Sequence, residues 1–241
     1  MSRLKVLIAN LLVNQVTGRI LRTLYGGTMQ FEGLKFHTRS SYISPRTSAA
    51  LFFKSYESAE VRFIKKYING YKGTIIELGS SIGVVANILS TYNPQATICG
   101  FEADGNLCSV ASENLALNGA SNATIYHEVL KGEGYVFKPG KYSTDGKIVL
   151  SGSNSTSNLL VDLITRYQID SPYTLVCDIE GAEYFILNDM EQLNGCEMIL
   201  IELHDIEVNG TLHKAEDLMR LLSKSFELIE RYGNVVVYGK C

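Results

Sequence analysis

The segment Thr74 to Leu89 constrains the fold of this chain more than any other part of the sequence. An apolar run, 74–78, is followed by two glycines four positions apart, Gly79 and Gly83, and then by apolar residues at helical spacing. This order predicts a buried strand, a tight turn and a helix. Glycine at these positions permits positive φ angles and leaves the first N–H groups of the helix open to a ligand. Such a turn is suited to a nucleotide-like cofactor.

The chemistry of this turn differs from that of a dinucleotide site. The pattern is Glu-x-Gly-x-x-x-Gly, starting at Glu77, whereas a pyrophosphate is bound by Gly-x-Gly-x-x-Gly. A carboxylate at the first position repels phosphate and suits a cationic ligand. S-adenosylmethionine carries an ammonium group and a sulfonium and has no phosphate. A second interpretation of Glu77, a core carboxylate satisfied by backbone N–H groups, also places it near the cofactor.

The composition permits one α/β domain with an N-terminal appendage, since 46% of the 241 residues are apolar and 20% are charged. We expect a helix and cap segment over 1–55 and the cofactor-binding domain over 56–241. The net charge of −3 provides no overall basic field for nucleic acid. Five cysteines without a Cys-x-x-Cys pair indicate buried, reduced thiols in a cytoplasmic protein.

Residues 1–25 combine basic residues with an apolar helical face formed by Leu4, Leu7, Ile8, Leu11 and Leu12. After Leu12 the stripe drifts, and Gly18 is expected to interrupt it. The apolar run is too short to span a bilayer, and a signal peptide is the less favoured interpretation because no convincing small-residue cleavage site follows it. Three roles are open for this segment: docking on the domain, docking on a second copy, or contact with the inner face of a membrane.

From residue 74 onward the pattern alternates between strands and helices. Strands are expected at 74–78, 96–102, 123–130, 173–177 and 198–203, and a hairpin at 226–238. Helices are expected at 106–117, 159–167, 182–193 and 214–225, and a further helix precedes the first strand, at 57–68. This alternation predicts a mostly parallel sheet with helices on both faces and an antiparallel hairpin strand at its edge. The Gly- and Ser-rich segment 131–158 is too long for an ordinary connection, so we expect an excursion near the active site, with short strands at 135–138 and 147–150.

Ligands bind outside the carboxyl ends of the strands in an open α/β sheet. Those ends are acidic here, and they carry Glu77, Glu102, Glu128, Asp178, Glu180, Glu202 and His204. Glu102 lies 19 residues beyond Gly83, close to the spacing at which a carboxylate accepts hydrogen bonds from ribose. A solvated glutamate is the alternative. Asp178, Glu180, Glu202 and His204 are also potential metal ligands, but no spacing is diagnostic and we expect no metal.

Several motifs in succession resemble those of the FkbM family of methyltransferases. They are Glu77-Leu78-Gly79-Ser80-Ser81-Ile82-Gly83, Phe101-Glu102-Ala103-Asp104, the run 113–119, Asp178-Ile179-Glu180-Gly181-Ala182-Glu183, and Ile201-Glu202-Leu203-His204. The resemblance covers roughly residues 55–240. It implies a Rossmann-like class I methyltransferase fold with a seven-stranded sheet. It also implies that S-adenosylmethionine is used to methylate a hydroxyl, often on a sugar, as in polysaccharide biosynthesis.

The resemblance further implies roles for individual residues. Glu77, Gly79, Ser80, Ser81 and Gly83 would hold the methionine part of the cofactor, Glu102 and Ala103 its ribose and adenine edge, and Glu57 belongs to a Tyr-Glu pair that precedes the first motif. The chain departs from the family at Ser80-Ser81, where Ala-Asn is frequent, and at Cys177, where a lysine is frequent. The second departure removes any role for a cation at that position.

Catalysis is expected at the acidic strand end that begins with Asp178. Asp178 or His204 would take the hydroxyl proton, and Glu180 lies on a neighbouring strand end. Structural roles are also open: a turn cap or a cofactor contact for Asp178, first-turn helix carboxylates for Glu180 and Glu183, and a loop hydrogen bond for His204. Two other functions are also open. One is an NAD-dependent oxidoreductase on the same type of sheet, and the other is a non-catalytic scaffold that retains the fold.

Overall fold

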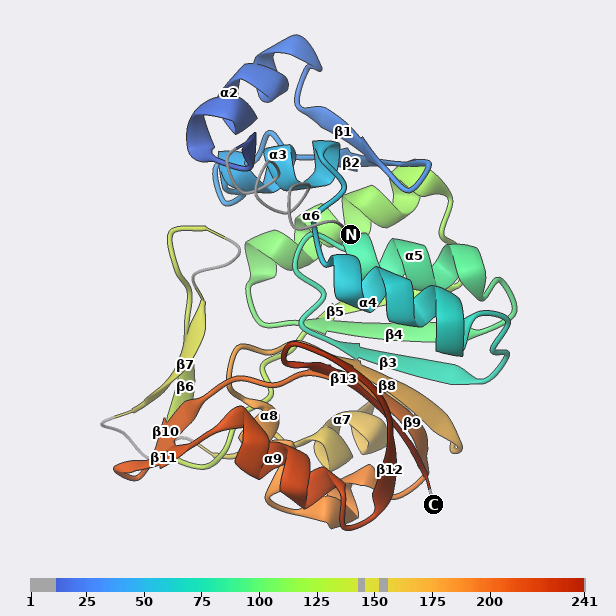
Figure 1. Ribbon diagram of the computed structural model, residues 1–241, viewed down its shortest axis with the longest axis vertical. Coiled ribbons are helices and arrows are strands. Elements are labelled where there is room, and N and C mark those ends of the chain that lie inside the picture. Colours follow the sequence, from blue (N-terminus) through green and yellow to red (C-terminus); the bar gives the residue numbers. More distant parts are fainter. Residues whose placement is uncertain (1–11, 143–145, 152–155, 241) are drawn as a thin grey trace.

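A seven-stranded sheet forms the centre of the computed structural model, which describes residues 12–142, 146–151 and 156–240 (Figure 1). The strands lie in the order β12 (Phe226–Tyr232), β13 (Val235–Lys240), β9 (Cys196–Glu202), β8 (Tyr173–Cys177), β3 (Thr74–Leu78), β4 (Thr97–Glu102) and β5 (Ala123–His127). Strands β5, β4, β3, β8 and β9 are parallel, and β13 runs antiparallel to both β9 and β12. The expected hairpin therefore closes the edge, and its inner strand is the antiparallel one.

This strand order and these directions define the Rossmann-like methyltransferase fold expected from the sequence. Strand β3 lies centrally, and the chain moves outward from it in one direction to β4 and β5, and in the other to β8 and β9. The order therefore reverses between β3 and β8. Ligands bind at such a switch point in open α/β sheets.

Helices cover both faces of the sheet (Figure 1). One face packs against α4 (Ser58–Phe63), α5 (Val84–Tyr92) and α6 (Gly105–Asn118), and the other against α7 (Leu160–Arg166), α8 (Glu183–Leu187) and α9 (Ala215–Leu222). Alternate residues of a strand enter different cores. Ile75 packs in the first core and Ile76 in the second, and both are fully buried. The apolar run in β3 reflects burial on both faces.

The cap precedes the sheet and comprises α2 (Gln15–Leu24), β1 (Thr28–Phe31), β2 (Leu34–His37) and α3 (Pro45–Phe52). It attaches to α6 through backbone N–H groups of β2: His37 donates to Asn114 Oδ1 at 2.7 Å and Lys35 to Asn118 Oδ1 at 2.9 Å. Cap and domain are thus joined by specific hydrogen bonds. The predicted apolar face over Leu4–Leu11 lies outside the described residues.

Gly18 was expected to interrupt the apolar stripe of residues 1–25, and it does not end the helix in which it lies. Gly18 lies inside α2, and a Cβ there would come within 1.7 Å of the Pro45 carbonyl oxygen. The residue is glycine because α2 and α3 pack too closely for a side chain. Helix α3 itself was not expected; Ser44 caps it and Pro45 occupies its first turn, both of which favour a helix start.

Two of the expected helices are each divided into two elements, and one hairpin was not expected. The helix expected at 57–68 is α4 followed by a π-helical turn, Ile64–Ile68, and the helix expected at 182–193 is divided into α8 and a 3-10 turn, Met190–Leu193. A small hairpin, β10 (Ile206–Val208) and β11 (Thr211–His213), was not expected. The short strands expected in 131–158 are confirmed as β6 (Tyr135–Lys138) and β7 (Lys147–Leu150), which pair antiparallel.

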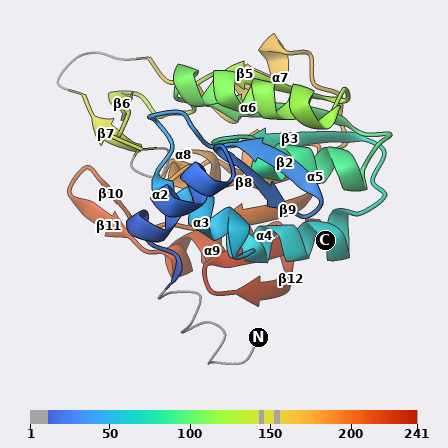
Figure 2. The ribbon, with the colours of Figure 1, turned by 90° about the horizontal axis from the view of Figure 1, so that it is seen from above.

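Figures 1 and 2 both show the β6–β7 and β10–β11 hairpins together on one side of the molecule. Four cysteines are described and all are free thiols, three buried and Cys108 half-buried; Cys241 lies outside the described residues. In the described part of the chain, no helix has the length and apolar character needed to cross a bilayer.

Candidate functional site

Two strand–turn–helix segments meet at the switch point of the sheet. The first links β3 to α5, and its turn holds Gly79 at φ +86°, Ser81 at +47° and Gly83 at +77°. The second links β8 to α8 and holds Glu180 at φ +52° and Gly181 at +102°. Positive φ angles are strained for residues with side chains, so both turns are tightly determined by their surroundings.

Gly79 is where the two turns touch. A Cβ on Gly79 would lie 1.8 Å from the carbonyl oxygen of Asp178, and the Asp178 N–H donates to the Leu78 carbonyl at 2.9 Å. Any side chain at position 79 would therefore push the turns apart. The predicted need for glycine at this position is explained by contact between the turns as well as by the φ angle.

Glu77 lies beneath the first turn, where it is 2% exposed. Its Oε2 accepts a hydrogen bond from Ser80 Oγ at 2.6 Å, whereas its Oε1 is buried without a hydrogen-bond partner among the described residues. Burial raises the pKa of Glu77 to about 7, and the negative charge of Glu102 adds to the effect. A buried carboxylate with an unsatisfied oxygen is a site that favours an incoming cation or donor.

Glu102 ends β4 on the other side of this turn. Its two oxygens accept hydrogen bonds from the backbone N–H groups of Ser81, at 2.6 Å, and Asp104, at 2.9 Å. Burial nevertheless raises the pKa of Glu102 to about 7. The two bonds fix the carboxylate in one orientation at the pocket wall, where its remaining lone pairs can accept further hydrogen bonds.

A pocket with about 900 Å³ of free space opens over these strand ends. Its described lining includes six carboxylates, Glu57, Glu102, Asp104, Glu128, Asp178 and Glu180, and one basic residue, Lys147. Apolar walls are provided by Leu78, Phe101, Leu107, Leu130 and Ile179 and by Phe137 and Ile148 of the β6–β7 hairpin. The predicted excursion 131–158 thus reaches the site.

A smaller cavity of about 320 Å³ lies on the other side of Gly79, and its carboxylates are Glu57, Glu60, Glu77, Asp178 and Glu202, with no basic residue among its described lining. Glu57 and Asp178 line both spaces. Burial, together with the charges of Glu60 and Asp178, raises the pKa of Glu57 well above its usual range, and burial raises that of Glu60 to about 7. No basic partner among the described residues that line the cavity offsets this effect, so the proton affinity of Glu57 and Glu60 is high.

The structure brings most of the predicted site residues together. Glu57, Gly79, Ser81, Glu102, Ala103, Asp178 and Glu180 line the large pocket, and Glu77 lines the small cavity. Ser80, Gly83 and His204 line neither. Ser80 faces inward and supports Glu77, Gly83 begins α5 against Ala111, and His204 lies behind Asp178 and Glu180. These three residues contact other parts of the site rather than its open space.

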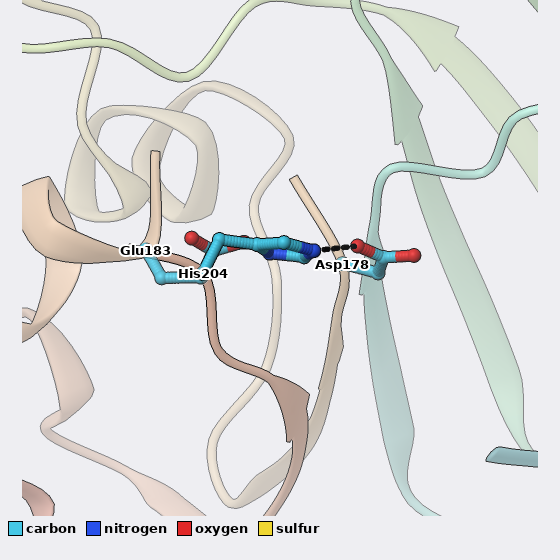
Figure 3. A group of neighbouring side chains, drawn as sticks. All are labelled: Asp178, Glu183 and His204. Atoms are coloured by element: carbon cyan, nitrogen blue, oxygen red, sulfur yellow. Dashed lines mark hydrogen bonds and ion pairs between the residues drawn. The ribbon is translucent and has the colours of Figure 1, made fainter. Parts of the chain in front are cut away.

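His204 lies between carboxylates of the second turn (Figure 3). Its Nδ1 is 3.2 Å from Glu183 Oε1, and its Nε2 is 3.9 Å from Asp178 Oδ1 and 3.6 Å from Glu180 Oε2. Glu183 is fully buried and also accepts the Ile179 N–H at 3.0 Å. The imidazole is thus held from behind by Glu183, with its other nitrogen facing the two carboxylates that line the pocket.

The charges in this group are linked. Burial lowers the pKa of His204, but the hydrogen bond to Glu183 and the charges of Glu183, Asp178 and Glu180 outweigh it and raise the pKa to about 9. Burial and the charge of Glu202 raise the pKa of Asp178 well above its usual range, although His204 acts in the opposite direction. The carboxylates around His204 therefore favour its imidazolium form, and the charge of that form opposes the effects that raise the pKa of Asp178.

Asp178, Glu183 and His204 also form a group whose potential ligand atoms lie within 4.8 Å of one another. However, the two ring nitrogens of His204 face different carboxylates, and one metal ion binds only one nitrogen of an imidazole. The observed geometry is that of an imidazole in contact with Glu183 through one nitrogen and with Asp178 and Glu180 through the other.

Two contributions to the site were not assigned from the sequence. Glu183 occurs in the quoted motif but was considered only as a first-turn helix carboxylate, and its contact with His204 depends on the approach of β9 to α8. Tyr56 was noted only as a neighbour of Glu57, yet it lines the pocket and its hydroxyl lies 3.4 Å from Ser81 Oγ. Sequence order alone cannot reveal such contacts between distant segments.

Comparisons with known proteins give only distant likenesses. No protein-family model and no curated protein sequence matches the chain. Among solved structures, an rRNA methylase from Streptococcus thermophilus aligns with a TM-score of 0.46 and 10% identity over 76% of this chain and 95% of that one. A precorrin-6y C5,15-methyltransferase from Geobacter metallireducens gives 0.46 and 12% over 76% and 88%. EvdMO1 gives 0.48 and 14% over 92% of this chain and 47% of its own. The fold assignment rests on the strand order and directions given above.

Proposed function

We propose that this chain is an S-adenosylmethionine-dependent methyltransferase. The observation that carries the proposal is the acidic character of the two spaces around Gly79, at the switch point of the fold. Their shared carboxylates, Glu57 and Asp178, and the buried Glu77 disfavour a pyrophosphate and favour a ligand with positive charge. S-adenosylmethionine carries two such charges, one on its sulfonium and one on its amino group.

The residues present fit this cofactor. Oε1 of Glu77 is buried without a hydrogen-bond partner among the described residues, and buried Oδ1 of Asp178 has only the ion-pair contact with His204 Nε2 at 3.9 Å, so the site contains acceptors that a cationic ligand can satisfy. Glu102 would hold the ribose hydroxyls, Ala103 the adenine edge, and Gly79, Ser81 and Glu57 the methionine part. When bound, the cofactor supplies an electrophilic methyl group.

We assign the proton acceptor to Asp178 in preference to His204. A general base must lie within hydrogen-bond reach of the reacting hydroxyl. Asp178 lines the pocket, whereas His204 lines neither space and lies behind Asp178 and Glu180. The raised pKa of His204 favours a charged imidazole beside Asp178, and that charge acts to lower the pKa of Asp178. The imidazolium, held by Glu183, fixes Asp178 and balances its charge. Glu180, which is half exposed, lies at the pocket wall and would contact the acceptor.

The acceptor we propose is a hydroxyl of a sugar in a glycan or glycosylated precursor, as the resemblance to the FkbM family implies. Two features support this choice. The half-exposed carboxylate of Glu180 can accept hydrogen bonds from sugar hydroxyls, and Phe137 and Tyr142 from the β6–β7 region provide aromatic surface in the same pocket. The hairpin would therefore select the acceptor.

Calorimetric titration of the protein with S-adenosylhomocysteine and with NAD tests the function. We expect heat of binding with the first compound and none with the second. Binding of NAD alone would indicate an oxidoreductase, and the absence of binding to both would indicate a scaffold that retains the fold. The acceptor class is tested by mass spectrometry of cell-surface glycans and lipid-linked precursors with and without the gene. Loss of one methyl group is expected.

A further inference from the structure

The cap and the domain carry opposite charge. Residues 1–56 contain eight Lys or Arg residues and one carboxylate, Glu32, whereas residues 57–241 contain 14 Lys or Arg residues and 24 carboxylates. Glu32 is itself paired with Lys65 of the domain. None of the described basic residues of the cap, Arg19, Arg22, Lys35, Arg39, Arg46 and Lys54, forms an ion pair within the described part of the chain. The cap is therefore a strongly basic surface.

Helix α2 presents its apolar side to solvent. Val16, Ile20 and Leu24, spaced four residues apart, are 63%, 55% and 72% exposed, and Arg19 is exposed on the same helix. Residues 12–52 provide seven of the 14 large apolar side chains that are exposed in the described chain. Such concentration of apolar surface on one segment marks an interaction site.

The opposite side of α2 explains this orientation. It faces α3 through Gly18 and through polar bonds: Arg22 donates to the carbonyls of Ile43 and Ser44, each at 2.8 Å, and Gln15 Nε2 donates to Ser44 Oγ at 2.9 Å. These bonds fix the helix and leave its apolar stripe outward. A helix that served only to cover the domain would bury that stripe.

Basic and aromatic side chains extend the surface at the end of α2. Tyr25 and Phe52 pack with their ring centroids 5.4 Å apart and are 53% and 38% exposed. They line an open groove of about 1020 Å³ together with Lys35 and Lys54. Exposed aromatic rings beside free lysines are typical of a helix that lies in the headgroup region of a membrane.

We propose that the outward face of the cap, formed by Val16, Arg19, Ile20, Leu24, Tyr25 and Phe52 with Lys35 and Lys54, binds the surface of an anionic lipid bilayer. A lipid surface satisfies both the apolar stripe and the uncompensated positive charge. A second copy of the chain does not, because a twofold interface through α2 would place one basic cap against another. The inference is independent of the proposed catalytic function.

Sedimentation of the full-length protein with vesicles tests the proposal. We expect binding to vesicles of phosphatidylcholine with phosphatidylglycerol, little binding to phosphatidylcholine alone, and weakening as salt is raised. The triple substitution Val16→Ser, Ile20→Ser, Leu24→Ser should reduce partitioning about tenfold or more, and Arg19→Glu about tenfold. Leu228→Ser with Ile229→Ser, which removes exposed apolar side chains of β12, is the matched control and should bind like the wild type.

Three results would refute the proposal: no binding of the wild type to anionic vesicles at low salt, undiminished binding of a folded triple variant, or light scattering that shows a dimer dissociated by the triple substitution. Thermal unfolding establishes that the variants fold. Titration with S-adenosylhomocysteine should give the same affinity in wild type and triple variant. Loss of vesicle binding is therefore separable from any failure of the catalytic proposal.

Discussion

The two turns at the switch point have the same architecture and different chemistry. Each follows a fully buried strand, contains residues at positive φ, and leads into a helix. In the first turn the carboxylate, Glu77, is buried under the backbone and supported by Ser80. In the second, Asp178 and Glu180 face the pocket, and the buried carboxylate, Glu183, supports His204 instead. Under the proposed function, the first turn would bind the charged cofactor and the second would accept the proton.

The contrast arises from where each buried carboxylate lies along the chain. Glu77 precedes its turn and is a buried residue of β3. Under the proposed function, its charge would act on the cofactor across the backbone of the turn. Glu183 follows its turn, at the first residue of α8, and reaches the histidine that ends the neighbouring strand β9. Substitutions that exchange carboxylate for amide should therefore affect binding at the first turn and turnover at the second.

The largest effect is expected for Asp178→Asn. The substitution preserves shape but removes the proton acceptor, so turnover should fall by about 10²- to 10⁴-fold. Affinity for S-adenosylhomocysteine should change far less, because Glu77 and Glu102 remain. Initial rates with saturating cofactor, together with calorimetric titration, separate the two quantities. Near wild-type turnover in this variant would show that Asp178 is not the base.

A smaller loss of turnover, about ten- to a hundredfold, is expected for Glu183→Gln, because Glu183 acts through His204 and touches no substrate. Without the Glu183 charge the pKa of His204 should fall from about 9 toward its usual value. The alkaline limb of the pH–rate profile should then move to lower pH. Glu180→Gln, which removes a half-exposed carboxylate 3.6 Å from His204 Nε2, is the control and should shift the limb less. An unmoved limb in Glu183→Gln would leave Glu183 with a purely structural role.

The same contact makes stability depend on pH. The pKa of His204 is raised on folding, so its contribution is fully present below about pH 6.5 and is lost as pH rises through about 9. The melting temperature of the wild type should therefore fall between these two pH values. The fall should be smaller in Glu183→Gln.

The first turn was more predictable from sequence than the second. Gly79, Gly83 and Glu102 are separated by fixed local spacings within one strand–turn–helix–strand unit, so the chain order determines their meeting. The meeting of Glu183 with His204 instead requires two strands to lie adjacent, which depends on the strand order of the whole sheet. The β6–β7 strands were likewise predicted from a local pattern, and Ser44 and Pro45 are local signals that could have predicted α3. The outward face of α2 instead depends on how the cap packs.

At the first turn, Glu77→Gln should weaken S-adenosylmethionine binding about tenfold, since it removes one charge from beneath the ligand. It should also change the stability of the free protein. Because burial raises the pKa of Glu77 from 4.5 to about 7, its favourable contribution is complete below pH 4.5 and is lost as pH rises through 7. The wild type should therefore lose more stability than the variant between pH 4.5 and 8. Denaturant unfolding at several pH values measures this slope, and equal slopes would contradict the role of Glu77.

The smallest expected effect concerns the pH dependence of binding itself. Glu77 and Glu102 both have pKa values of about 7 in the free protein, and a cation stabilises their ionised forms. Affinity for S-adenosylmethionine should therefore rise severalfold, up to about tenfold, between pH 6 and 8 and then level off. S-adenosylhomocysteine lacks the sulfonium, so its affinity should rise less steeply over the same range. Parallel calorimetric titrations of both compounds measure the difference. Identical slopes would show that the carboxylates of the first turn do not sense the sulfonium, and that the positive charge they bind lies on the amino group alone.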